Sequence, residues 1–175
     1  MAGTRIQILS LSDIDCTEEL PETQETLEGN SLEKASHLYE SYKLPCFADD
    51  TGLEVEALNG APGVYSARYA GPQRSSDDNI ALLLKNLENK RNRTARFRTV
   101  ITLLGFEAKP LYFEGVIAGS ISPEKRGAQG FGYDPVFVPV NHAKSFGQMS
   151  MAEKNQLSHR SLAVEKLVKY LTQLG

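Results

Sequence analysis

Leu44-Pro45-Cys46-Phe47-Ala48-Asp49-Asp50-Thr51-Gly52-Leu53 is the stretch on which the fold and the chemistry of this sequence depend. Its apolar start predicts a short buried strand, and two carboxylates, a hydroxyl and a glycine follow at once. The ends of such strands are where α/β folds place ligand-binding groups. The adjacent carboxylates indicate either a site for a hard cation such as Mg²⁺ or acid–base chemistry, and the plainer interpretation is an Asp-Asp-Thr-Gly turn. The stretch alone favours neither.

Length, charge and cysteine usage narrow the classes of protein. The 175 residues predict a single domain, 1–175, that buries a core without disulfides or a structural metal. Charged residues make up 23% of the chain and the formal net charge is -3, which argues against nucleic-acid or membrane partners. Cys16 and Cys46 have no zinc or redox spacing, and no apolar run reaches membrane-spanning length. We therefore expect a soluble, cytoplasmic protein.

Residues upstream of the opening stretch predict a strand and a helix. Arg5-Ile6-Gln7-Ile8-Leu9 alternates like a strand. Asn30 offers an N-cap for a helix over residues 31–42. The side chains expected on the buried face of that helix are Leu32, Ala35, Tyr39 and Tyr42.

Downstream periodicity predicts two further helices and a pair of strands. Ser76 can cap a helix with Ile80, Leu83, Leu84 and Leu87 on its apolar face. Residues 94–104 and 111–118 are β-rich and are joined around Gly105 to Pro110, which is typical of an antiparallel pair. A last helix is expected over 158–174, with Val164, Leu167, Val168 and Leu171 facing the core. The fold class is therefore α/β, a mixed twisted central sheet with flanking helices.

Gln129-Gly130-Phe131-Gly132-Tyr133-Asp134-Pro135 is the second cluster with chemical potential. Its glycines let the backbone approach a ligand closely, and its two rings offer faces on which a purine base stacks. The alternative is a glycine-rich turn with Phe131 in the core and Tyr133 half exposed. Both interpretations stay open on this segment alone.

Lys154 and Ser158-His159-Arg160 form the third cluster. Ser158 can cap the last helix, so that His159 and Arg160 lie in its first turn beside free backbone N–H groups. Cations there oppose the helix dipole, which is a mild indication of an electronegative ligand. Solvated surface charge is the alternative interpretation, and it applies equally to Glu22, ahead of the first helix, and to Arg68.

Several motifs in one order resemble a known family. They are Glu22-Thr23 before Thr26 and Asn30, Lys34-Ala35, Ala48-Asp49-Asp50-Thr51-Gly52-Leu53, Gly60-Ala61-Pro62-Gly63-Val64-Tyr65-Ser66-Ala67-Arg68-Tyr69, Gly130-Phe131-Gly132-Tyr133-Asp134-Pro135, and Glu153-Lys154 with Ser158-His159-Arg160. Together they are similar to the inosine/xanthosine triphosphate pyrophosphatases, the Ham1-like family. The resemblance implies a Ham1/Maf-type fold and a homodimer. It also implies Mg²⁺-dependent hydrolysis of ITP, dITP and XTP to the monophosphate and pyrophosphate, which removes deaminated purines from the nucleotide pool.

The resemblance also implies roles for individual residues. Asp50 matches the metal-binding carboxylate and general base, Asp49 supports it, and Glu22 matches an upstream metal ligand. Substrate contacts are implied for Thr51, Phe131, Gly132, Tyr133, Asp134, Lys154, His159 and Arg160. Donors at His159 and Arg160 would accept a 6-keto purine and reject the 6-amino group of adenine.

The start of the chain departs from the family pattern. Family members begin with a strand, a Thr-Gly-Asn-x-x-Lys loop that holds the triphosphate, and a helix, whereas Met1-Ala2-Gly3-Thr4 leads straight into Arg5. We expect an N-terminally shortened member with weak or absent activity. The alternative function is therefore a nucleotide-binding remnant, and a phosphatase that releases orthophosphate is a third possibility, although the sequence lacks its DxDx[TV] pattern.

Overall fold

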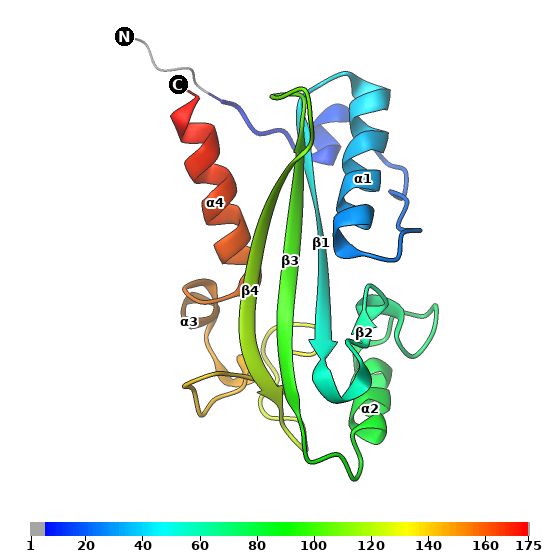
Figure 1. Ribbon diagram of the computed structural model, residues 1–175, viewed down its shortest axis with the longest axis vertical. Coiled ribbons are helices and arrows are strands. Elements are labelled where there is room, and N and C mark those ends of the chain that lie inside the picture. The colour runs from blue at the N-terminus through cyan, green and yellow to red at the C-terminus, as the bar shows by residue number, and fades with distance from the viewer. Residues whose placement is uncertain (1–5, 175) are drawn as a thin grey trace.

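The computed structural model describes residues 6–174, which form a five-stranded sheet with helices packed on it (Figure 1). The strand order is β2-β1-β3-β4-β5, and the bounds are β1 Cys46–Val55, β2 Pro62–Gly63, β3 Thr94–Leu104, β4 Leu111–Ile121 and β5 Phe137–Pro139. The α/β class is confirmed. Every pairing among these strands is antiparallel, where a mixture of directions was expected, because the long β3–β4 hairpin has β1 and β5 added antiparallel to its two edges.

The turn interpretation of Asp49-Asp50-Thr51-Gly52, which the sequence left open, is wrong, because β1 continues through these residues. All ten residues of β1 pair with β3, from Cys46 opposite Leu104 to Val55 opposite Ala95. Cross-strand hydrogen bonding over that length outweighs the local turn preference of Asp and Gly. Because side chains alternate along a strand, Asp49 and Asp50 point to opposite faces of the sheet.

The first helix, α1 (Leu27–Tyr42), begins earlier than the sequence predicts. Thr26 is its N-cap and accepts from the Gly29 N–H, so Asn30 lies inside the helix and the predicted Asn30 cap is wrong. The predicted buried face is also shifted, since Tyr39 is exposed. The residues of α1 that are buried are Leu27, Asn30, Ser31, Lys34, Ala35 and Leu38, three of them polar.

The strand expected over residues 5–9 is wrong as far as the described residues reach. Ile6 to Ser10 has no strand structure and leads into a short 3₁₀ helix, Leu11–Ile14, while Arg5 lies outside the described residues. Ile8 and Leu9 are exposed, and within residues 6–174 this segment pairs with no strand.

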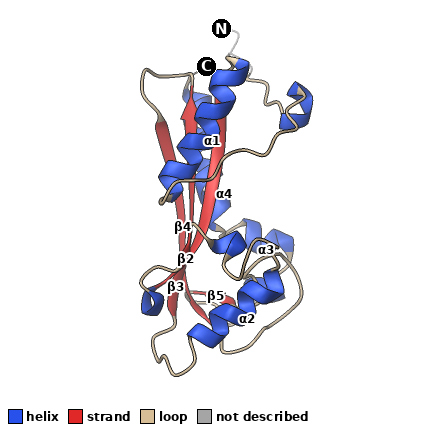
Figure 2. Cartoon of the chain, turned by 90° about the vertical axis from the view of Figure 1, so that its right-hand side faces the viewer, coloured by secondary structure: helices blue, strands red, loops and turns tan. Residues whose placement is uncertain are grey.

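The remaining helices are α2 (Ser76–Asn86), α3 (Met151–Asn155) and α4 (His159–Gln173), and α4 packs on β3 and β4. The α1 side chain Ser31 bonds to Thr102 of β3, whereas α4 packs on Ile101 and Leu103, so α1 and α4 cover opposite faces. Figure 2 shows α2 and α3 near the end of the sheet that lies away from the two chain termini. Ile80 and Leu83 of α2, with Leu87 just beyond its end, belong to a second core with Leu53, Val55 and Phe97.

The positions predicted for α2 and α4 agree with the structure better than their predicted caps and buried faces do. Ser75 rather than Ser76 caps α2, and Ser158 caps α4 as predicted. The predicted α4 core residues Leu167 and Leu171 are buried, but Val164 and Val168 are exposed. Among residues 6–174, none of the helices combines the length and the apolar character that a membrane span needs.

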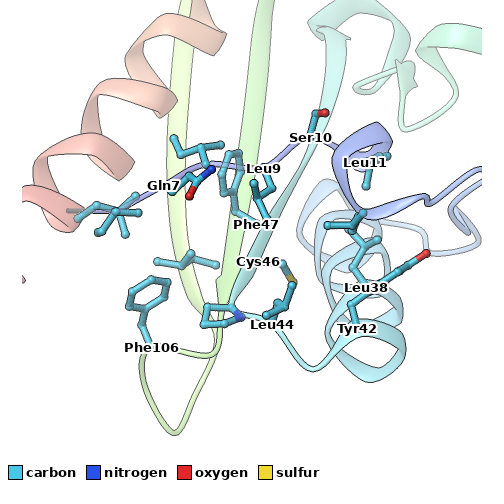
Figure 3. A pocket seen from close by; sticks show the side chains of 16 residues that line it. Gln7, Leu9, Ser10, Leu11, Leu38, Tyr42, Leu44, Cys46, Phe47 and Phe106 are labelled. Carbon is cyan, nitrogen blue, oxygen red and sulfur yellow. The ribbon is translucent and has the colours of Figure 1, made fainter. Parts of the chain in front are cut away.

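A cavity of about 470 Å³ lies between residues 6–14, α1 and the start of β1 (Figure 3). Its walls are mainly apolar, with Leu9, Leu38, Leu44 and Phe47 among them. None of the described residues that line it is an Asp, Glu, Lys, Arg or His. It therefore lacks the charged groups that chemistry on a phosphate needs, and the candidate site lies further along β1.

Candidate active site

Asp50 lies on the α1 face of β1 and is enclosed by donors from that helix. Its Oδ2 accepts from Asn30 Nδ2 at 3.0 Å, and its Oδ1 accepts from Lys34 Nζ at 3.2 Å. Asn30 and Lys34 are one helical turn apart, so both project from the same side of α1. Lys34 Nζ also donates to Glu22 Oε1 at 2.9 Å. A single ammonium thus joins two carboxylates that are 28 residues apart in the chain.

Burial and neighbouring charges have opposite effects on the pKa values of Asp50, Glu22 and Lys34. Burial raises the pKa of Asp50 above its ordinary value, although Lys34 and Asn30 oppose that rise. Burial acts to raise the pKa of Glu22 as well, but Lys34 and the more distant Arg68 lower it overall. Burial acts to lower the pKa of Lys34, and Glu22 and Asp50 more than offset it, so that pKa is raised. The cluster holds a charged lysine at neutral pH.

Glu22 and Asp50 offer the type of ligand atom that a divalent cation binds, but two carboxylates are too few to complete its coordination shell. Their convergence on one positively charged group shows that the pair presents oxygen ligands to a cation, and carboxylate oxygens suit Mg²⁺. Among residues 6–174 no group of three or more His, Cys, Asp or Glu side chains comes together. Protein side chains would therefore supply only part of a magnesium shell, with water and phosphate oxygens as the usual remaining ligands.

A cavity of about 270 Å³ lies on the opposite face of β1. Thr51 and Leu53 of β1 form one wall, so the cavity and the Asp50 cluster share this strand. Thr51 Oγ1 pairs with Thr99 Oγ1 of β3 at 2.7 Å. The predicted site residues that line the cavity are Thr51, Phe131, Gly132, Tyr133, Asp134, Lys154, His159 and Arg160.

The turn interpretation of the glycine-rich segment placed Phe131 in the core and left Tyr133 half exposed, and the structure shows the reverse. Phe131 is 64% exposed at the cavity, whereas Tyr133 is 4% exposed and donates its hydroxyl to the Ser66 carbonyl at 2.9 Å. Phe131 is therefore the ring with a free face for stacking. The turn depends on Gly130, because its φ of +79° lies in the left-handed region that residues with a Cβ rarely adopt, and an added Cβ would overlap the Asp134 carboxylate.

Asp134 orients this turn and the lysine beside it. It is 2% exposed, accepts from the Phe131 N–H at 2.8 Å and forms an ion pair with Lys154. The Lys154 ammonium lies 4.5 Å from the centre of the Phe131 ring. The turn, the exposed Phe131 ring and the buried Lys154 ammonium are therefore held together near the N-terminus of α4.

His159 is buried in the wall of the cavity with a ring nitrogen free. Its ring stacks on Phe97 with centroids 4.7 Å apart, and within residues 6–174 its Nδ1 is buried without a hydrogen-bond partner. Buried polar atoms are nearly always bonded, so this atom indicates a missing ligand or water. Burial, with help from Arg160 and Lys154, lowers the pKa of His159 to about 3.

The lowered pKa of His159 predicts a pH-dependent loss of stability. The unfolded chain binds a proton near the ordinary pKa of 6.5 and the folded chain does not, so stability is present above pH 6.5 and is lost as pH falls toward 3. Between pH 7 and 5 the loss from this group is about 2 kcal/mol. Urea unfolding of the wild type and His159→Gln at both pH values measures it. An equal pH response in the two proteins would contradict the assignment.

Arg160 connects the cavity to the strand. Its guanidinium donates to Asp49 Oδ2 at 3.1 Å and lies 6.0 Å from the centre of the Phe131 ring. Asp49 therefore belongs to the cavity side and does not contact the Asp50 cluster, contrary to the supporting role expected for it. The physical reason is the alternation of side chains along β1.

The segment from Pro62 to Ala70 passes around the edge of β1. It contacts both the cavity and the carboxylate cluster of Glu22 and Asp50. Ser66 and Ala67 line the cavity, while Arg68 donates to Glu22 Oε2 at 3.4 Å and to the Glu22 carbonyl at 3.2 Å. Asn79 of α2 holds this segment by donating to the Ala67 carbonyl at 3.0 Å. The carboxylate cluster and the cavity are thus connected through one strand and one loop.

Comparisons with known proteins show which family the chain resembles. The sequence pattern of the Ham1 family matches residues 1–170. The chain belongs to the Ham1 family. A Flavobacterium johnsoniae relative described as a dITP/XTP pyrophosphatase is 53% identical, over 98% of this chain and 89% of its own length. A Porphyromonas gingivalis relative with the same description is 52% identical, over 95% of this chain and 86% of its own length.

Solved structures of Ham1 proteins have the same fold. The Staphylococcus aureus Ham1 protein superposes with a TM-score of 0.91 at 38% identity, covering 97% of this chain and 88% of that one. A HAM1 protein from Coxiella burnetii superposes with a TM-score of 0.86 at 40% identity, covering 89% and 81%. The Ham1-like fold expected from the sequence is confirmed.

Sequence reasoning missed two residues that the structure places at the Ham1 site. Asn30 was interpreted as a cap and Lys34 was given no role, yet both contact Asp50. Their spacing of four, which places both on one face of the helix with the apolar Leu27, Ala35 and Leu38, was the available signal. Arg68 was left open between surface charge and function, and the structure places it on Glu22.

Proposed function

We propose that this protein hydrolyses deaminated purine nucleoside triphosphates such as dITP, ITP and XTP to the monophosphate and pyrophosphate, with Mg²⁺ as cofactor. The observation that carries the proposal is the shared strand β1, which has a buried carboxylate on one face and an aromatic, cationic cavity on the other. The relatives described as dITP/XTP pyrophosphatases support it. The enzyme class is hydrolase.

The carboxylate cluster would serve the triphosphate. Glu22 and Asp50 would hold Mg²⁺, which supplies charge neutralisation to the phosphate oxygens when bound. Asp50 would take a proton from the water that attacks the α-phosphorus, while the bond from that phosphorus to the bridging oxygen breaks and pyrophosphate leaves. A carboxylate whose pKa is raised by burial is a better proton acceptor than an ordinary one. Lys34 and Arg68 add positive charge beside it.

The cavity would select the base. Phe131 offers the exposed ring for stacking, and the neutral His159 and the guanidinium of Arg160 would donate to a 6-keto oxygen. The 6-amino group of adenine would meet those donors with hydrogens of its own, and a buried donor left unpaired is costly. The site therefore favours hypoxanthine and xanthine over adenine.

Product analysis tests the proposal. We expect Mg²⁺-dependent release of pyrophosphate and dIMP from dITP, measured by coupled pyrophosphate detection and by chromatography of the nucleotides. Release of orthophosphate would indicate a phosphatase instead. Binding of dITP without turnover would indicate a nucleotide-binding remnant, which is the alternative function.

Base selection gives a separate prediction at Arg160. The wild type should prefer dITP to dATP by at least about 100-fold in kcat/KM, and Arg160→Ala should narrow that ratio by lowering the rate with dITP. Arg96→Ala is a matched control, because Arg96 is an exposed arginine of β3 that pairs with Glu54 away from the cavity. An unchanged ratio in Arg160→Ala would remove Arg160 from base recognition.

A homodimer and a cytoplasmic location accompany this function as predictions. Both described cysteines, Cys16 and Cys46, are free thiols, which suits a reducing compartment. Light scattering of the purified protein measures the oligomeric state. A mass of one chain at micromolar concentration would contradict the dimer.

A further inference from the structure

Asn30 is a fully buried polar side chain inside α1, and packing does not explain it. Asparagine is a poorer helix former than alanine or leucine, because its side chain competes for backbone hydrogen bonds. A buried amide is also costly unless its donor and acceptor are both bonded. A position that served packing alone would favour an apolar residue, so Asn30 meets a polar requirement.

That requirement is visible in its two hydrogen bonds. Asn30 Nδ2 donates to Asp50 Oδ2 at 3.0 Å, and Asn30 Oδ1 accepts from the Gln24 N–H at 2.9 Å. Gln24 is two residues beyond Glu22, the second carboxylate of the cluster. One planar amide therefore connects the strand that carries Asp50 with the segment that carries Glu22.

Lys34 joins the same two carboxylates, but in a different way. Its ammonium occupies the place between Glu22 Oε1 and Asp50 Oδ1, so a divalent cation drawn to the pair competes with it. The amide of Asn30 is neutral and bonds to the other oxygen of Asp50. It can therefore keep its two bonds when a cation is present.

We propose that Asn30 is a positioning residue that fixes the Asp50 carboxylate relative to the Glu22 segment and thereby sets the affinity of this pair for a divalent cation. The inference rests on the proposed function, because that function assigns the pair to Mg²⁺. Partners that orient metal ligands typically contribute 10–100-fold to metal affinity or activity.

Two variants remove the bonds in different ways. Asn30→Ala removes the amide and improves helix propensity, and Asn30→Leu removes it at similar volume. Ser31→Ala is the matched control. Ser31 is the next residue of α1 and equally buried, but its hydroxyl contacts Thr102 at 2.7 Å and neither carboxylate.

The test is a titration of the full chain with Mn²⁺ alone, followed by electron paramagnetic resonance, beside thermal unfolding of each variant. Both Asn30 variants should raise the Mn²⁺ dissociation constant by about 10–100-fold and raise the Mg²⁺ concentration for half-maximal pyrophosphate release. Ser31→Ala should stay within about twofold of the wild type in both. Added Mg²⁺ should restore part of the activity of Asn30→Ala, which a purely structural defect would not allow.

Two results would overturn the inference. One is an Mn²⁺ affinity in the folded Asn30 variants equal to that of Ser31→Ala, and the other is no Mn²⁺ binding by the wild type. The proposed function fails separately. If the wild type binds Mn²⁺ but releases no pyrophosphate from dITP, the function is wrong, while the Mn²⁺ comparison still decides the role of Asn30.

Discussion

Asp50→Asn should lower kcat for pyrophosphate release from dITP by about 10³-fold, because it removes both the proton acceptor and a charged oxygen ligand. The fold should survive. Asp50 accepts from both Asn30 and Lys34, whereas an Asn has only one acceptor oxygen, so the substitution leaves one buried donor unpaired and should lower the free energy of unfolding by about 1–3 kcal/mol. Steady-state kinetics and urea unfolding measure the two effects.

Asp49→Asn is the matched control for that experiment. Asp49 has the same chemistry and lies one residue away, but it faces the cavity and bonds to Arg160. Its loss should cost about tenfold or less in kcat/KM, mainly through KM. Equal losses in kcat for the two variants would contradict the separation of the two residues by the sheet.

Gly115→Ala should produce the largest loss of stability, about 3 kcal/mol in the free energy of unfolding. Gly115 of β4 lies directly under α4, where a Cβ would overlap the His159 carbonyl and lie 2.6 Å from the Ala163 nitrogen. Both neighbours are backbone atoms, so the helix itself must move. A loss of that size lowers the melting temperature by about 10 °C for a protein of this length.

The displacement of α4 should also reach the cavity. His159 and Arg160 form the first turn of α4, so a shift of the helix moves the stacking of His159 on Phe97 and raises KM for dITP. Ser120→Ala, at an exposed position of the same strand, should stay within about 0.5 kcal/mol of the wild type. Calorimetry and kinetics on both variants test this. A wild-type melting temperature for Gly115→Ala would show that α4 does not lie so close to β4.

The elements that local patterns specify could be predicted from the sequence. Residues 94–104 and 111–121 form the long hairpin because β-rich runs flank a turn, and Ser158 caps α4 because its hydroxyl accepts the Ser161 N–H. The eight residues predicted to contact substrate also line one cavity. Their roles in binding remain predictions.

The failures share a cause, which is dependence on distant partners. Asp49-Asp50-Thr51-Gly52 has local turn preferences, but pairing with β3 holds it extended. Helical periodicity counted only apolar residues as inward, so the buried face with Asn30 and Lys34 was misplaced. Tyr133 is buried because its hydroxyl reaches the Ser66 carbonyl, 67 residues away, a contact that no local pattern predicts.

The alternation of side chains in β1 also constrains how this sequence can change. Whether a position along the strand is odd or even decides whether its side chain joins the Asp50 cluster or lines the cavity, since Asp50 and Thr51 differ by one residue. A single-residue insertion ahead of Asp49 would exchange the two assignments, whereas an insertion of two would preserve them and shift the strand by about 7 Å. Sequence length within β1 is therefore under a stricter constraint than sequence identity, and loops beyond its ends are where length can vary.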